Sequence, residues 1–193
     1  MAPPFAADAS GKCRRLLAFA LWLAVVCGVC VAGLPTVDAG QASEADVKAA
    51  FVLSFLKFVE WPASRIPQAG GAFVIVVIGD DAVLASLTRA SATQRVLDRA
   101  VSIRSTRSPE GLGAAHLVFI AGNAGHGLPL VLRELDGKVV LTVGDTPGYA
   151  QAGVVLNLFV QDDRVRFEAN TAAAARAGLR LSSHLLRVAR IVG

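Results

Sequence analysis

The sequence predicts an α/β protein, a single layered domain with a mixed β-sheet flanked by helices and with a C-terminal β-hairpin and helix. Three observations lead to this prediction. Short runs rich in valine and isoleucine alternate with segments of helical apolar spacing through the first part of the domain. Two later apolar runs are joined by a short polar connection, as in a hairpin. The last segment returns to helical spacing and supplies the final helix.

The length of the chain is enough for one domain. It has 193 residues, and residues 16–34 form an uncharged apolar run. About 150 residues then remain, and a domain of that size buries one sizeable core. The formal charge of +4 includes Lys12, Arg14 and Arg15 ahead of the apolar run, so the domain itself is only weakly basic. Nucleic acid is not expected as a partner, because its binding surfaces cluster Lys and Arg on one face.

The N-terminus is typical of a Sec-type signal peptide, predicted over residues 1–39. Basic residues precede the apolar run, and small residues follow it, so we expect cleavage after Ala39 or Ala42. The main alternative is an uncleaved signal that anchors the protein in the inner membrane, because the run approaches the ~20 residues that span a bilayer. A lipoprotein is disfavoured, because valine precedes both Cys27 and Cys30. A cleaved and an uncleaved signal both place the domain, residues 43–193, on the far side of the membrane from the cytoplasm.

Cysteine and histidine usage predicts neither a metal nor a cofactor. The three cysteines, Cys13, Cys27 and Cys30, all precede the domain, which would then contain no thiol. His116 and His184 are far apart, and the third histidine adds no ligand spacing.

The first helix of the domain is predicted to begin at Ser43, with Asp46 three residues on as in a capping box. Phe51, Phe55 and Phe58 then follow at helical spacing, and much of the remaining helix surface is apolar too. Such a helix is either deeply buried or keeps an apolar face for a partner. It should end at Glu60-Trp61-Pro62, because proline disfavours helical backbone in the residue before it.

The remaining elements follow from shorter patterns. The continuous apolar run 73–78 is typical of a strand covered on both faces. The last segment is expected to be helical, with Gly178 dividing it into two pieces. The predicted strands are 73–78, 101–104, 116–120, 138–143, 154–160 and 164–168, and the predicted helices are 82–89, 129–135 and 171–192, with a brief helix or turn from Ser108.

Two short motifs are candidates for a phosphate-binding or catalytic site. The loop Gly122–Gly127 lies between a strand and a helix, where backbone amides can bind phosphate. Its glycine spacing differs from the dinucleotide fingerprint, so a turn is the preferred interpretation. Ser183 and His184 cannot form a nucleophile and base pair, because neighbours on a helix point about 100° apart.

Asp145 and Glu168 are the best-placed carboxylates, because each lies at the end of a predicted strand. Neither has a partner acid or a nucleophile beside it in the sequence, which makes catalysis unattractive. We interpret Asp145 as a turn residue and Glu168 as an edge-strand residue paired with Arg166 or another arginine. No catalytic residue is predicted, and the chain is not expected to be an enzyme.

Several segments in order resemble the YfiR-like family of exported bacterial proteins. The similarity begins at the helix end, residues 55–62, with its Phe-x-x-Trp-Pro pattern, and continues through residues 74–79 and 116–120. It is strongest in Leu-Thr-Val-Gly-Asp at 141–145, in 166–170 and in 177–186. Together these segments span nearly all of the domain.

This resemblance implies a periplasmic regulator without enzymatic activity. In the best-known system of the family, the protein binds the periplasmic sensory domain of an inner-membrane diguanylate cyclase and holds it inactive. An OmpA-like outer-membrane lipoprotein can sequester it, which releases cyclic-di-GMP synthesis and favours biofilm. Members of that type carry disulfide-forming cysteines, whereas residues 43–193 contain none. Redox control by disulfides is therefore not expected here.

The primary hypothesis is a negative regulator that docks through two helices, with a homodimer as a further option. Its candidate surface consists of residues from the first helix and the last one, namely Phe51, Phe55, Phe58, Trp61, His184 and Arg187. The alternative is a small-molecule sensor or carrier with a crevice near Asp145 and Glu168, at the carboxyl ends of strands. A hydrolase using Asp145 or Ser183 is the least favoured class.

Overall fold

The computed structural model describes residues 43–122 and 127–193. The predicted signal peptide and its cleavage sites, together with most of the glycine-rich loop Gly122–Gly127, lie outside these ranges. The described helices are α2 Glu44–Phe58, α3 Asp81–Ser91, α4 Leu128–Glu134, α5 Thr171–Arg176 and α6 Ser183–Leu186, and the strands are β1 Val59–Glu60, β2 Ala72–Ile78, β3 Ala100–Ser105, β4 Leu117–Ile120, β5 Leu141–Gly144, β6 Leu156–Gln161, β7 Arg164–Asn170, β8 Arg180–Leu181 and β9 Arg190–Val192.

A seven-stranded mixed sheet forms the middle of the domain, which confirms the predicted fold class. Its strand order is β3-β2-β4-β5-β6-β7-β9. The five strands from β3 to β6 run parallel, β7 returns antiparallel to β6, and β9 pairs parallel with β7. The hairpin turn is made by Asp162 and Asp163, which both have positive φ, as a tight turn between twisted strands requires.

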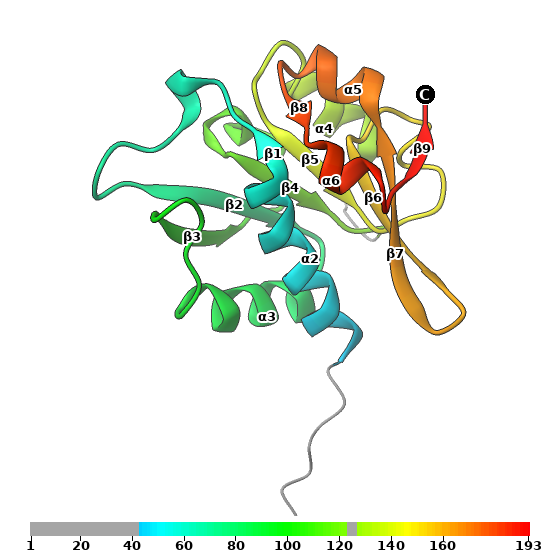
Figure 1. The fold of residues 1–193 in the computed structure, drawn as a ribbon, viewed down its shortest axis with the longest axis horizontal. Coiled ribbons are helices and arrows are strands. Elements are labelled where there is room, and N and C mark those ends of the chain that lie inside the picture. Colours follow the sequence, from blue (N-terminus) through cyan, green and yellow to red (C-terminus); the bar gives the residue numbers. More distant parts are fainter. Residues whose placement is uncertain (1–42, 123–126) are drawn as a thin grey trace, which may run out of the picture. The chain divides into compact units, whose positions relative to one another are not determined.

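Helices cover both faces of the sheet (Figure 1). Along β2, Phe73, Ile75 and Val77 pack into a cluster with α2, α3, α5 and α6, while Val76 and Ile78 pack into a second cluster with α4. Side chains of a strand alternate between faces, so a strand that is apolar at both sets of positions must be covered twice. The continuous apolar run of the sequence is explained by these two layers.

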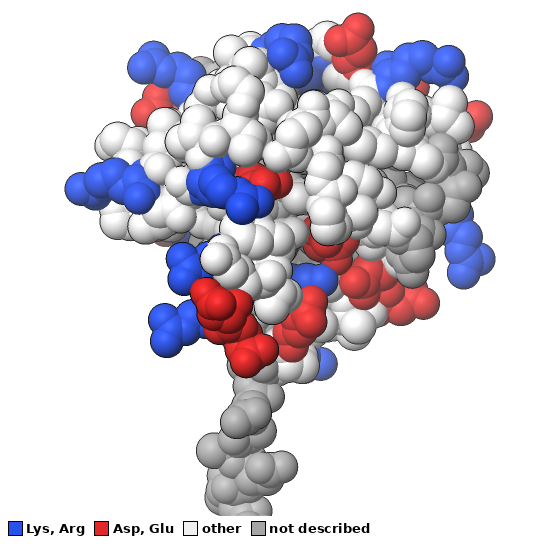
Figure 2. All heavy atoms as spheres, turned by 90° about the vertical axis from the view of Figure 1, so that its right-hand side faces the viewer, with Lys and Arg blue, Asp and Glu red and all other residues white. Residues whose placement is uncertain are grey.

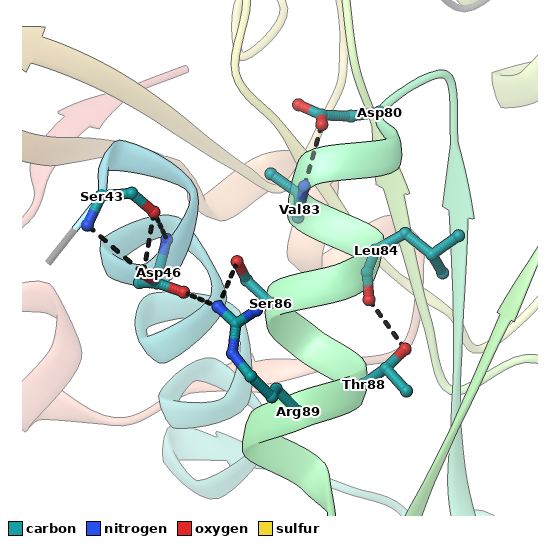
Figure 3. A network of polar contacts seen from close by, with 8 residues as sticks. All are labelled: Ser43, Asp46, Asp80, Val83, Leu84, Ser86, Thr88 and Arg89. Carbon is teal, nitrogen blue, oxygen red and sulfur yellow. Dashed lines mark hydrogen bonds and ion pairs between the residues drawn. The ribbon is translucent and has the colours of Figure 1, made fainter.

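The first helix begins as predicted. Ser43 is the N-cap of α2, its hydroxyl accepts from the Asp46 amide, and the Asp46 carboxylate accepts from the Ser43 amide. Figure 3 shows that Asp46 also meets Arg89 of α3, which in turn reaches Ser86. The hydrogen bond from the Ser43 side chain contributes most to lowering the pKa of Asp46 to about 2. The capping box therefore fixes the start of α2 and also links it to α3.

The C-terminal segment differs from the prediction. The helix expected over 171–192 is divided at Gly178, as predicted, where φ is +66°, but it does not continue to its end. Residues 180–181 pair with β1 in a separate two-stranded sheet, and residues 190–192 form the edge strand β9. The prediction of a strand from Lys138 was three residues early, since β5 begins at Leu141. None of the helices in the described ranges has the length and apolarity needed to cross a membrane.

Candidate functional site

An apolar groove of about 420 Å³ runs between α2 and α6. Figure 1 shows these two helices on the same side of the sheet. The groove is lined by seven residues of α2, one residue of β7, and three residues of α6 and the turn that follows it. They are Asp46, Val47, Ala50, Phe51, Ser54, Phe55, Phe58, Phe167, His184, Leu185 and Val188.

The two-residue ladder between β1 and β8 creates this groove. Val59, directly after α2, pairs with Leu181, directly before the cap of α6. The Ser182 amide also donates to the Phe58 carbonyl at 3.0 Å. Ser182 then caps α6 by accepting from the Leu185 amide. The end of one helix is thereby fixed beside the start of the other.

Phe58 and His184 form the exposed wall of the groove. Their rings stack with centroids 5.1 Å apart and an interplanar angle of 29°. Arg187 donates to His184 Nδ1 at 3.2 Å, which orients the imidazole. Phe58 is 37% exposed and Val188 is 69% exposed, so two large apolar side chains of the groove lining face solvent. Isolated exposed apolar residues are ordinary, but a continuous apolar groove is typical of an interaction site.

The floor of the groove is a packed aromatic cluster. The rings of Phe55 and Phe167 meet edge to face at 5.0 Å, and Phe51 lies 5.9 Å from each of them. Phe55 is only 2% exposed. The floor is therefore rigid, since close-packed aromatic rings resist rearrangement, and the groove exists without a partner.

Of the predicted surface residues, Trp61 lies apart from the groove. It is 9% exposed, packs against Phe73 and His116, and donates from Nε1 to the Leu56 carbonyl at 3.0 Å. The structure brings Phe51, Phe55, Phe58 and His184 together as groove residues, and Arg187 supports His184 from outside. Sequence reasoning missed Phe167 and Val188 as groove residues, although the helical spacing of Leu181, Leu185 and Val188 was visible.

Asp145 is paired with a lysine of the first helix. Lys48 Nζ lies 2.7 Å from Asp145 and 2.9 Å from Glu44, and the side chains of Lys48 and Asp145 are only 14% and 10% exposed. Burial alone would lower the pKa of Lys48, but the hydrogen bonds to Asp145 and Glu44 outweigh it and raise that pKa. Asp145 thus links the end of β5 to the N-terminal part of α2.

We expect a double-mutant cycle on Lys48→Met and Asp145→Asn to give a coupling energy of about 1–2 kcal/mol. This exceeds the ~0.2–1 kcal/mol of an exposed pair, because both side chains are largely withdrawn from water. Urea unfolding of the two single variants and the double variant measures it. Arg180 and Glu60, which are paired at 3.4 Å but 85% and 59% exposed, provide the matched control cycle. Equal coupling in the two cycles would contradict the prediction.

Glu168 lies inside the sheet, so its predicted place on an edge strand was wrong. β9 pairs with the outer side of β7, and the register aligns Asn157, Glu168 and Arg190 in one row across three strands. Arg190 forms an ion pair with the Glu168 carboxylate, Asn157 Nδ2 donates to it at 3.3 Å and Gln151 Nε2 at 3.4 Å. Burial raises the pKa of Glu168, but these donors outweigh it and lower that pKa overall. The arginine that pairs with Glu168 is therefore Arg190 and not Arg166.

The Leu-Thr-Val-Gly-Asp stretch is explained by packing. The Thr142 hydroxyl accepts from the Val155 amide at 2.9 Å. A Cβ on Gly144 would lie 2.7 Å from the Tyr149 ring and 2.9 Å from Asn157 Oδ1, so only glycine fits without a shift. Thr142 and Gly144 thus serve the packing of β5 against β6, and Asp145 links β5 to α2. Within the described ranges, no group of three His, Cys, Asp or Glu residues is placed to hold a metal ion.

The fold and the groove define a small α/β protein with an apolar groove between two helices. The chain belongs to the YfiR/HmsC-like family, whose model matches residues 45–190. This confirms the resemblance seen in the sequence. No curated protein matches it.

The chain also matches solved structures, of which two are described. A conserved domain protein from Vibrio cholerae O1 biovar El Tor gives a TM-score of 0.53 at 10% identity, with 78% of this chain and 60% of that one covered. The ABC domain in complex with L-Trp from Streptococcus pneumonia gives 0.49 at 8% identity, covering 73% of this chain and 59% of that one. The chain therefore spans about 60% of the length of either structure. The first similarity shows a shared fold alone, and the second carries no argument.

Proposed function

We propose that the protein is a periplasmic negative regulator that binds the sensory domain of an inner-membrane diguanylate cyclase and thereby lowers cyclic-di-GMP. Membership of the YfiR/HmsC-like family supports the regulatory class. The observation that carries the proposal is the preformed apolar groove between α2 and α6, with Phe58 and Val188 exposed along it. The signal peptide over residues 1–39 is part of this proposal, because the target domain lies outside the cytoplasm.

The groove suits an apolar segment of a protein partner. Its walls are two helices and its floor is aromatic. Among the described lining residues, Asp46 is the only carboxylate, and it is already paired with Arg89. Figure 2 shows one face of the molecule on which acidic side chains gather near the start of the described chain and a central area carries few charges. An amphipathic helix from the cyclase could lay its apolar side in such a groove. An OmpA-like outer-membrane lipoprotein would release the cyclase by sequestering the regulator, and a second copy of the chain is the other protein that could fill the groove.

The cellular test is deletion of the gene. Without the inhibitor, the cyclase should be released, so cellular cyclic-di-GMP and biofilm mass should both rise. Mass spectrometry of nucleotide extracts measures the first, and complementation with the full-length gene should reverse both changes. Unchanged cyclic-di-GMP in cells that normally express the protein would contradict the proposed target.

The groove itself is tested with charge substitutions. Phe58→Asp and Val188→Asp should each weaken binding to the periplasmic domain of the cyclase by about tenfold or more, because a carboxylate would be buried against apolar surface. Leu130→Asp is the matched control, since Leu130 is 41% exposed and lies on α4, across the sheet. Titration calorimetry measures affinity, and light scattering identifies a dimer. The groove would not be the binding surface if only Leu130→Asp lost binding, or if all three variants bound like the wild type.

A further inference from the structure

A second cavity of about 230 Å³ lies at the amino ends of β5 and β6, and none of its described lining residues belongs to the groove. α4 and the turn after it form one wall, the loop before β6 forms another, and α5 forms the third. The residues that matter for a ligand are Leu135, Val140, Thr142, Ala152, Val155 and Arg176.

The cavity exists because β5 and β6 are paired only briefly. Their ladder consists of Val143 with Leu156 and Gly144 with Asn157. One residue earlier, the Val155 amide donates to the side chain of Thr142 at 2.9 Å instead of to a neighbouring backbone. The two chains are therefore bridged by a hydroxyl at the point where the sheet opens, and Thr142 and Val155 line the opening.

Thr142 supplies a donor to this cavity. It is 4% exposed, and its hydroxyl oxygen already accepts from Val155. A hydroxyl also carries one proton to donate, and among the described residues it donates to no acceptor. A buried donor without an acceptor is unfavourable, and a ligand oxygen in the cavity would satisfy it.

Arg176 supplies a positive charge to a lining that also contains the acidic Asp136. It is exposed at the last turn of α5 and forms no ion pair with any residue in the described ranges, whereas Lys138 is paired with Glu134 at 2.6 Å. A Cβ on Gly153 would lie 3.9 Å from Arg176 Nη2 and 3.6 Å from Leu132 Cδ1. The guanidinium therefore lies at the edge of the cavity, next to the apolar wall.

We propose that this cavity binds a small aliphatic carboxylate that carries an acceptor oxygen along its chain. The carboxylate pairs with Arg176, whose planar guanidinium matches it with two parallel hydrogen bonds. The methylene groups lie against Leu135, Val140 and Val155, which are almost fully buried and apolar. The oxygen on the chain accepts from the Thr142 hydroxyl. The volume limits the ligand to a short chain, below the ~300–1,000 Å³ of sites for drug-sized molecules.

The test is calorimetric titration of the protein with 4-oxopentanoate, with pentan-1-amine as the probe of opposite charge. We expect saturable binding of the oxo acid with a dissociation constant in the millimolar range or below, and no binding of the amine. Arg176→Gln should weaken binding by about tenfold, because it removes a charge-assisted pair. Ala152→Leu should abolish binding, since Ala152 is exposed in the loop that lines the cavity and a larger side chain there fills it.

Arg166→Gln is the matched control. Arg166 is an exposed arginine on β7 that lines neither cavity, so its loss should leave the affinity unchanged. Circular dichroism of each variant checks that it is folded. The proposal is overturned if 4-oxopentanoate does not saturate, if the amine binds equally, or if Arg176→Gln and Ala152→Leu bind like the wild type. None of these outcomes depends on a cyclase partner, so the two proposals fail or succeed separately.

Discussion

Replacing Arg190 with glutamine is expected to lower the free energy of unfolding by about 2–3 kcal/mol at neutral pH. The variant leaves the carboxylate of Glu168, whose side chain is 5% exposed, with only the amide donors of Asn157 and Gln151. The expected loss lies below that of a fully buried pair, because Arg190 is 59% exposed and water screens it. The variant also loses the contact of the guanidinium with the Phe159 ring, 4.3 Å from its centroid. Urea unfolding measures the difference.

The pH dependence of this effect distinguishes it from lost packing. In the wild type, the pKa of Glu168 is lowered, so its contribution is present above the ordinary value of 4.5 and is lost as the pH falls through the lowered pKa. The difference between wild type and Arg190→Gln should therefore shrink in acid. Arg166→Gln, on the same face of β7 but exposed and unpaired among the described residues, should leave stability unchanged. A constant difference from pH 7 to pH 3 would contradict the role assigned to Glu168.

Much of the fold was predictable from local patterns. The run 73–78 is apolar at every position, which requires a strand covered twice, and β2 has this arrangement. Ser43 and Asp46 predicted the start of α2 because both halves of a capping box lie within four residues. The polar connection 161–163 predicted the hairpin, because the residues of a tight turn are also neighbours in the sequence. In each case, the interactions that decide the structure are local in the sequence.

The errors lie where pairing is nonlocal. Residues 190–192 follow a helix and continue its apolar spacing, but they pair with β7 and end the sheet. β1 and β8 are two residues long, too short for any periodicity to indicate them. Glu168 was predicted to lie on an edge strand because no strand was predicted after β7. This was wrong, since β9 pairs with the other side of β7.

The groove depends on the same nonlocal contact. The sequence identified Phe58 and His184 as separate candidates on two helices, and nothing in their spacing showed that their rings would stack. The ladder of Val59 with Leu181 brings them together. Trp61 continued the aromatic series, but β1 turns it into the core beside Phe73. Residue types therefore indicated an apolar surface, while its position was set by a two-residue sheet.

Protonation of His116 is expected to destabilise the protein below neutral pH. His116 is 9% exposed, its Nδ1 accepts from the Val74 amide at 3.0 Å, and its Nε2 lies 3.0 Å from the Arg65 carbonyl. An imidazole that accepts at Nδ1 and donates from Nε2 is neutral. Burial and then the charge of Arg65 lower its pKa below 6.5, against a raising effect of the hydrogen bond to the Arg65 backbone. A proton on Nδ1 would break the bond to Val74.

The sign of the pH effect follows from this lowered pKa. Above the ordinary pKa of about 6.5, neither the folded nor the unfolded state binds the proton, so the contribution of His116 is fully present. As the pH falls below that value, the unfolded state is protonated first, and stability should fall by up to ~1.4 kcal/mol per pH unit until the folded pKa is reached. Urea unfolding between pH 8 and pH 5 measures this slope.

His116→Phe separates titration from packing. Phenylalanine keeps an aromatic ring against Trp61 and Phe73, whose centroids lie 6.0 and 4.9 Å from the imidazole. It removes both hydrogen bonds and leaves the Val74 amide unpaired, which should cost about 2–3 kcal/mol at pH 8. The variant should then show a flatter pH profile between pH 8 and pH 5. Circular dichroism at pH 8 checks that the variant is folded. A wild-type slope in His116→Phe would contradict the role assigned to His116.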